Sequence, residues 1–205
     1  MSRRASWSSA WVSSWAPFEI SATDAATGED RRRVAAFEAL VALTAGHVER
    51  ALRALERAVY SDGAAPGLER GTIPVVAEAL LVAAPADAAR ALAALGERWR
   101  PAIASPLVVV RALPAAIRRI LGAATTRDDD DAVAAALDST FVREHHLVAH
   151  VAALWAESRR RSLAGDAEGA AAASAAARER ARAAGHVGLG DALDAEASRG
   201  GGAHR

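Results

Sequence analysis

The chain has 205 residues, and its 25 basic and 25 acidic side chains balance to a formal net charge of zero. A balanced charge gives no long-range attraction for a polyanion, so we expect no nucleic-acid partner. The chain has no cysteine and no lysine, which excludes thiol catalysis, cysteine-ligated zinc and a lysine Schiff base. Because 52% of the residues are hydrophobic but only 4% are aromatic, leucine, valine and alanine must build the core, and this predicts an all-α protein.

Residues 1–28 are predicted to be a flexible leader. The stretch 1–18 is rich in serine, contains two arginines and has no acidic residue. This composition is typical of an organelle transit peptide, so a cytoplasmic location and import into an organelle both stay open. Trp7, Trp11 and Trp15 are spaced four apart, which indicates the alternative of a helix that docks one face on the body.

Residues 29–164 are predicted to form one helical domain. Apolar residues recur every three or four positions over 31–59, which predicts one or two helices with a break at Gly46. The sequence Thr72-Ile73-Pro74 predicts the start of the next helix, with the threonine as its cap, and this helix extends to about Ala84. No apolar run reaches the ~20 residues of a membrane span, so we expect a soluble protein with at most transient membrane contact.

The middle of the chain continues the helical pattern. Residues 87–98 predict a helix, and residues 107–121 predict another that is kinked near Pro114. A buried strand over 107–110 is less consistent with apolar positions that continue at helical spacing. The acidic run 128–131 is expected to be a solvated cluster before a helix N-terminus.

The last third is predicted to contain one long helix over 132–161 and an alanine-rich helix over 165–184. Glycine is frequent from residue 185 onward, so residues 165–205 are expected to end in a disordered tail. Taken together, the elements predict a two-layer bundle of about six to eight helices.

Three of the six histidines lie in the predicted 132–161 helix. On a helical wheel, His146 and His150 fall opposite the apolar stripe, so we expect them to face water. Glu144 falls inside that stripe and His145 at its edge, so both are expected to face the interior. A buried carboxylate needs a cationic partner, and the candidates are two arginines of the preceding helix, Arg111 and Arg118.

The same helix carries a family resemblance. Ala136-Leu137-Asp138, Phe141, His145 and Leu147 resemble a helix of the glycolipid transfer protein family, and 107–113 resembles another helix of that family. The resemblance covers the C-terminal third and part of the middle. It implies two layers of helices around an apolar slot for lipid chains, and its matched positions at the slot's mouth are Arg111 and His145.

These observations lead to three hypotheses about function. The first is a non-enzymatic protein, without cofactor, that binds an apolar small molecule or lipid, with Arg111, Asp138, Glu144 and His145 at the mouth of the slot. The second is an enzyme with a divalent metal on His47, His146 and His150, because a lone histidine followed by His-x-x-x-His resembles the DinB-like helical bundles. The third is a helical scaffold that binds another protein.

Overall fold

The computed structural model describes residues 28–45, 47–59, 72–95 and 107–200, and every regular element in these ranges is an α-helix. The predicted all-α class is therefore confirmed. The helices are α2 (Gly28–Thr44), α3 (Val48–Val59), α4 (Ile73–Val82), α5 (Pro85–Leu95), α7 (Val108–Ile120), α8 (Arg127–Asp138), α9 (Thr140–His145), α10 (Leu147–Leu163), α11 (Ala167–Ala183) and α12 (Val187–Gly200). The predictions for the leader with Trp7, Trp11 and Trp15 lie outside the described residues.

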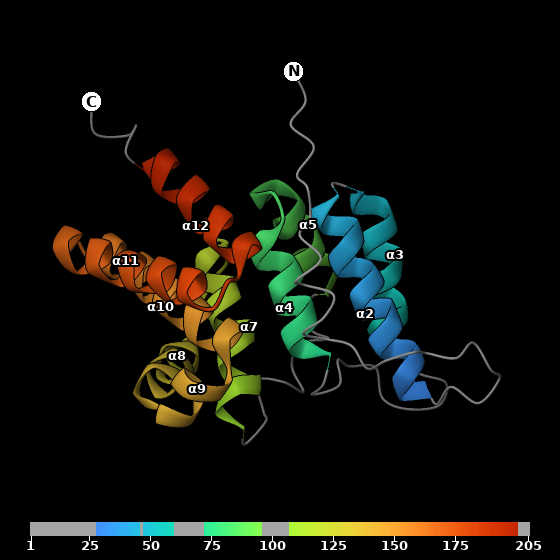
Figure 1. Cartoon of the computed structure of the whole chain (residues 1–205), viewed down its shortest axis with the longest axis horizontal. Helices are drawn as coiled ribbons and strands as arrows, with labels where there is room; N and C mark the ends of the chain where they lie inside the picture. The colour runs from blue at the N-terminus through green and yellow to red at the C-terminus, as the bar shows by residue number, and fades with distance from the viewer. Residues whose placement is uncertain (1–27, 46, 60–71, 96–106, 201–205) are drawn as a thin grey trace.

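The helices pack as a bundle in which α10 is central. Figure 1 shows α2 and α3 side by side at one end of the molecule and α10 with α11 at the other, with α4 and α7 between them. Helix α10 contacts α4, α7, α8, α9 and α11, and α12 contacts α4 and α11. None of the described helices is both long and apolar enough to cross a membrane.

Alanine allows the helices to approach each other closely. The buried faces of α2 and α3 consist largely of alanine, as do those of α10 and α11. A methyl side chain keeps helix axes near the short end of the usual 8–10 Å spacing. Most of the larger fully buried side chains come from α4, α7 and α12, among them Leu80, Ile117 and Leu189.

Local signals fix several helix ends where the sequence predicted them. The break between α2 and α3 falls at residues 45–47, as predicted. Thr72 directly precedes α4 and Pro74 lies in its first turn, although the Thr72 side chain does not cap the helix. Pro114 lies inside α7 and is buried, so the 107–110 run belongs to a helix and not to a strand.

The predicted disorder from residue 185 is wrong for 187–200, which form α12. Leu189 and Leu193 of this helix are fully buried. Two similar turns precede α11 and α12: each has a glycine with positive φ, Gly165 and Gly185, a conformation that L side chains rarely adopt. The next residue in each turn, Asp166 or His186, caps the new helix through its side chain.

The predicted single helix over 132–161 is also wrong, because the chain breaks at Ser139 and His146 into α8, α9 and α10. Ser139 has extended backbone dihedrals, and its hydroxyl accepts a hydrogen bond from the Val142 amide at 3.2 Å. His146 also leaves the helical region, at φ −131° and ψ 74°. These two breaks raise the number of helices above the predicted six to eight among the described residues alone.

Candidate functional site

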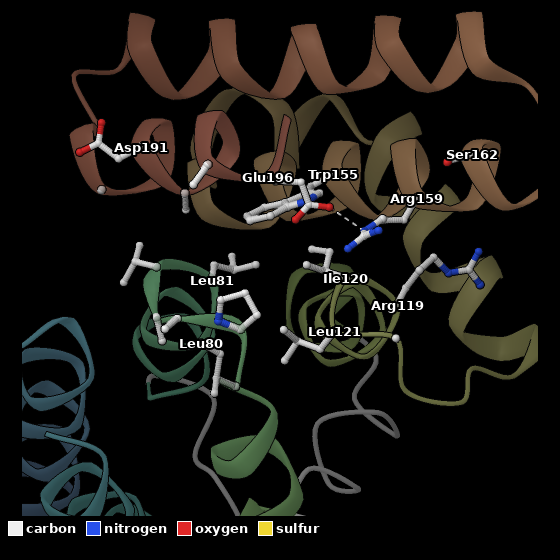
Figure 2. A pocket seen from close by; sticks show the side chains of 18 of the residues that line it. Leu80, Leu81, Arg119, Ile120, Leu121, Trp155, Arg159, Ser162, Asp191 and Glu196 are labelled. Atoms are coloured by element: carbon white, nitrogen blue, oxygen red, sulfur yellow. Dashed lines mark ion pairs between the residues drawn. The ribbon is translucent and has the colours of Figure 1, made fainter. Parts of the chain in front are cut away.

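A cavity of about 570 Å³ opens between α4, α7, α10 and α12, and we refer to it as the cleft. Figure 2 shows Leu80 and Leu81 on one side, Ile120 and Leu121 on another, and Trp155 across from them. The α12 wall is built from small residues, Gly188, Ala192 and Ala195, together with Asp191 and Glu196. Its volume is within the range of about 300–1,000 Å³ typical of small-molecule sites.

The C-terminal ends of α4, α7 and α10 and one face of α12 form the cleft. Helix α4 contributes its last turn and the residues that lead into Pro85, and α7 contributes its last turn with Leu121 and Gly122. Trp155 of α10 is only 6% exposed, so its ring is mostly packed against the core. A Cβ at Gly188 would lie 3.4 Å from the Val82 side chain, which is an ordinary van der Waals contact.

Two arginines that line the cleft each form an ion pair with a carboxylate. Arg159 forms an ion pair with Glu196, with Nε and Oε1 2.7 Å apart, which links α10 to α12 (Figure 2). Arg119 pairs with Asp130, and its side chain is 10% exposed. Ser162 adds a hydroxyl on the α10 side. The cleft is therefore an apolar space with guanidinium groups beside it.

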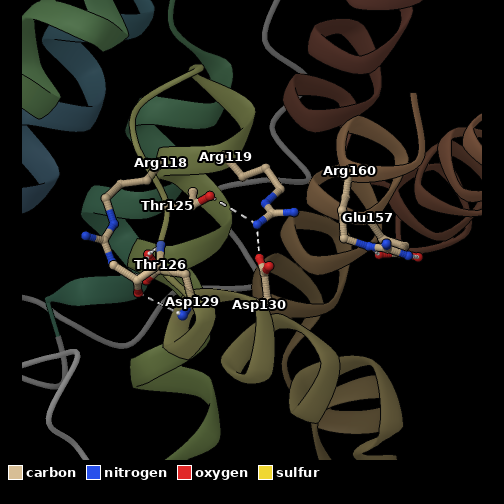
Figure 3. A network of polar contacts seen from close by, with 8 residues as sticks. All are labelled: Arg118, Arg119, Thr125, Thr126, Asp129, Asp130, Glu157 and Arg160. Carbon is tan, nitrogen blue, oxygen red and sulfur yellow. Dashed lines mark hydrogen bonds and ion pairs between the residues drawn. The ribbon is translucent and has the colours of Figure 1, made fainter. Parts of the chain in front are cut away.

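The α7–α8 turn holds Arg119 in place through a network of polar contacts, shown in Figure 3. Thr126 and Asp129 form a capping box, in which Asp129 Oδ2 accepts from the Thr126 amide at 2.8 Å and the Thr126 hydroxyl accepts from the Asp129 amide. Arg118 also pairs with Asp129. Arg119 donates to Thr125 Oγ1 at 3.2 Å in addition to its ion pair.

This network corrects two sequence predictions. The acidic run was expected to be solvated before the helix. Asp128, Asp130 and Asp131 are exposed as expected, but Asp129 is 2% exposed, and the run lies in the first turns of α8 rather than in a loop. Arg118 was a candidate partner for Glu144, but its partner in the structure is Asp129.

The four residues predicted for the mouth of the slot do not line the cleft. Asp138, Glu144 and His145 are exposed, and Arg111 is partly buried on α7. None of them makes a hydrogen bond or ion pair with another of the four in the described structure. The predicted inward orientation of Glu144 and His145 is wrong, because the breaks at residues 139 and 146 rotate α9 relative to the wheel of a continuous helix.

The three histidines of the metal hypothesis do not converge. His47 is exposed beside the α2–α3 turn, His146 is partly buried, and His150 is 9% exposed. The prediction that His150 faces water is therefore wrong, for the same reason of helix phase. Within the described ranges, no group of three histidine, aspartate or glutamate side chains is placed to hold a metal ion.

Several cleft residues were missed by the sequence reasoning. Trp155 and Arg159 stand four apart on α10, a spacing that places them on one face. This spacing is visible in the sequence, but taken alone it indicates only an amphipathic helix. Glu196 and Ala192 fall in the part of the chain that was expected to be disordered.

Comparison of the chain with protein-family models, curated proteins and solved structures found no match. The resemblance to glycolipid transfer proteins therefore stays a prediction from the residues quoted above.

Proposed function

We propose that this protein is a non-enzymatic binding protein that holds an apolar small molecule, such as a fatty acid or the acyl chain of a lipid, in the cleft. The observation that carries the proposal is the cleft itself, about 570 Å³ of space walled by leucine, isoleucine, alanine and one tryptophan. Transfer of apolar ligand surface from water into such a space stabilises a complex by roughly 25 cal/mol per Å² before the costs of association.

Arg159 gives the site a preference for an amphiphile with an anionic end. Its side chain is 47% exposed, and its partner Glu196 belongs to another helix. A carboxylate or phosphate can accept from the same forked donors, so a ligand head group can share or replace the contact to Glu196. The apolar tail then lies against Ile120, Leu121 and Trp155.

The test is a fluorescence titration of the delipidated protein with a long-chain fatty acid. Trp155 is the reporter, so the other four tryptophans, Trp7, Trp11, Trp15 and Trp99, are replaced with phenylalanine. We expect a saturable change in Trp155 emission and a co-purified ligand in native mass spectrometry of the untreated protein. No saturable change together with no co-purified ligand would contradict the proposal.

A variant that fills the cleft separates specific binding from adsorption. Ala192→Phe places a ring into the cleft and is expected to abolish binding. Ala172→Phe is the matched control, because Ala172 is exposed on α11 and does not line the cleft. Equal loss in both variants would show that the added ring, and not the filled cleft, causes the effect.

A further inference from the structure

A second polar site lies where α9, α10 and α11 meet, away from the cleft. Three cationic or titratable side chains gather there, and we refer to them as the basic cluster: Arg143, His150 and Arg180. His150 and Arg180 stand equally far in sequence from the turn glycine Gly165, so the antiparallel pairing of α10 and α11 sets them opposite each other. The Arg180 guanidinium reaches α9, where it donates to the backbone carbonyl of Arg143.

Two nitrogens of the basic cluster are buried without a hydrogen-bond partner. These are Nδ1 of His150 and Nε of Arg180, neither of which contacts an acceptor in the described structure. His150 is 9% exposed, so the residue is largely removed from solvent. A buried polar nitrogen that makes no hydrogen bond costs about 1–3 kcal/mol, and such groups are rare in folded proteins.

No carboxylate of the described residues neutralises the basic cluster. Neither Arg143 nor Arg180 forms an ion pair there, although most other arginines of α7, α10 and α11 do. The polar contacts of Arg143 are with Thr140 Oγ1 at 3.2 Å and, through its carbonyl, with Arg180. Burial lowers the pKa of His150, and the charges of Arg180 and Arg143 lower it further.

We infer that the basic cluster is a binding site for a phosphate group, with His150 at its base and the guanidinium groups of Arg143 and Arg180 at its rim. A phosphate group accepts several hydrogen bonds at once and carries the negative charge that the two guanidinium groups lack among the described residues, so it is the class of ligand that matches these donors. Arg143 is exposed and supplies a further forked donor from the open side. The inference is independent of the cleft and of what the cleft binds.

The test is a calorimetric titration of the full chain with inorganic phosphate at constant ionic strength. We expect one saturable site, with shifts of the His150 ring signals in NMR spectra. Arg180→Gln and Arg143→Gln are each expected to weaken binding by about tenfold or more, because each removes a charge-assisted hydrogen bond. Arg53→Gln is the charge-matched control, since Arg53 is exposed on α3, far from the site in sequence.

A second arm distinguishes the two sources of such a group. Vesicles of phosphatidylcholine are compared with vesicles that also contain phosphatidic acid. Binding to inorganic phosphate alone supports the site and assigns it to free phosphorylated molecules, whereas phosphate-competed binding to the phosphatidic acid vesicles supports it and assigns it to a lipid head group.

The inference is overturned if neither probe binds, or if Arg53→Gln weakens binding as much as the cluster variants do. Arg180→Gln also removes the contact to the α9 carbonyl, so its fold is checked by circular dichroism. Arg143→Gln leaves that carbonyl in place, and unchanged phosphate affinity in this folded variant together with unchanged affinity in His150→Gln would equally overturn the site.

Discussion

The α7–α8 turn and the α9–α10–α11 junction each place two arginines near helix ends, yet they use them differently. At the α7–α8 turn, Arg118 and Arg119 each face an aspartate of the first turn of α8. At the junction, Arg180 donates to the backbone carbonyl of Arg143, and the charges of both arginines lower the pKa of His150. Neither arginine forms an ion pair with a carboxylate among the described residues. In the first arrangement each guanidinium is paired with a carboxylate of the fold. In the second, neither guanidinium has a carboxylate partner among the described residues, so an external anion can pair with it.

The comparison shows how charge pairing separates structural arginines from candidate binding arginines. A buried ion pair fixes the position of a turn, and breaking it by removing one partner is costly. Cations that lie close together without a counter-charge lower the stability of the fold. Such a cluster is therefore a candidate binding site. Composition and net charge do not distinguish these two cases, because both regions contain arginine at similar density.

The largest expected effect comes from breaking the paired region. Asp129→Ala removes the capping box and leaves Arg118 and the Thr126 amide without their partner. We expect the free energy of unfolding to fall by about 3 kcal/mol, measured by urea denaturation. Asp131→Ala is the control: this residue is exposed, and the loss should stay within about 0.5 kcal/mol. Similar losses in both variants would contradict a special role for Asp129.

The unpaired region predicts a dependence of stability on pH. Because the folded-state pKa of His150 lies below the ordinary value of 6.5, the unfolded chain binds a proton more readily than the folded one. Protonation of His150 at acid pH therefore lowers the free energy of unfolding, and we expect stability to fall as the pH decreases through 6.5. His150→Gln should flatten this part of a plot of unfolding free energy against pH. The exposed His145 gives the control, His145→Gln, which should leave the slope unchanged.

The smallest expected effect on stability comes from Glu157, whose ion pairs with Arg160 and Arg161 lie near the surface. Glu157 accepts hydrogen bonds from Arg160 and Arg161 at 2.7 Å, and these contacts lower its pKa from 4.5 to about 2. Its stabilising contribution is present above pH 4.5 and is lost as the pH falls towards 2. Solvent screening limits this contribution to about 1 kcal/mol or less.

The prediction for Glu157 is tested by thermal unfolding of the wild-type protein and of Glu157→Gln at neutral pH, first at low salt and then at high salt. We expect a small loss at low salt that shrinks as salt is added. A loss as large as that of Asp129→Ala would remove the distinction between the surface and buried pairs.

The sequence predicted elements that local chemistry determines. The turn between α2 and α3, the start of α4 at Thr72 and the helical state of 108–120 all follow from residues close to each other in the chain. Pro85 opens α5 in the position that proline favours in helices. Such predictions need no knowledge of what the helix packs against.

The orientation of the histidines could not be predicted in the same way, because each residue of a helix advances the phase by about 100° and one undetected break shifts every later position. Ser139 did carry a local signal, since serine is a favoured cap and its hydroxyl caps α9. His146 carries no comparable signal. The break there depends on how α9 and α10 pack against neighbours distant in sequence.

The candidate sites depend even more on tertiary contacts. Leu80, Ile120, Trp155 and Ala192 come from four helices, and no spacing in the chain links them. The burial of Asp129 depends on Arg118, and the pairing of His150 with Arg180 depends on the direction in which α11 returns along α10. The alanine composition of 165–184 predicted that helix but not which of its faces would be covered.

Helix α10 carries both proposed sites, with His150 near its beginning and Arg159 near its end. At 1.5 Å per residue, these positions are separated by about 14 Å along the axis. Counterions attenuate electrostatic repulsion over about 8 Å at physiological ionic strength. Two bound anions would therefore repel each other only weakly, so occupation of one proposed site would not prevent occupation of the other.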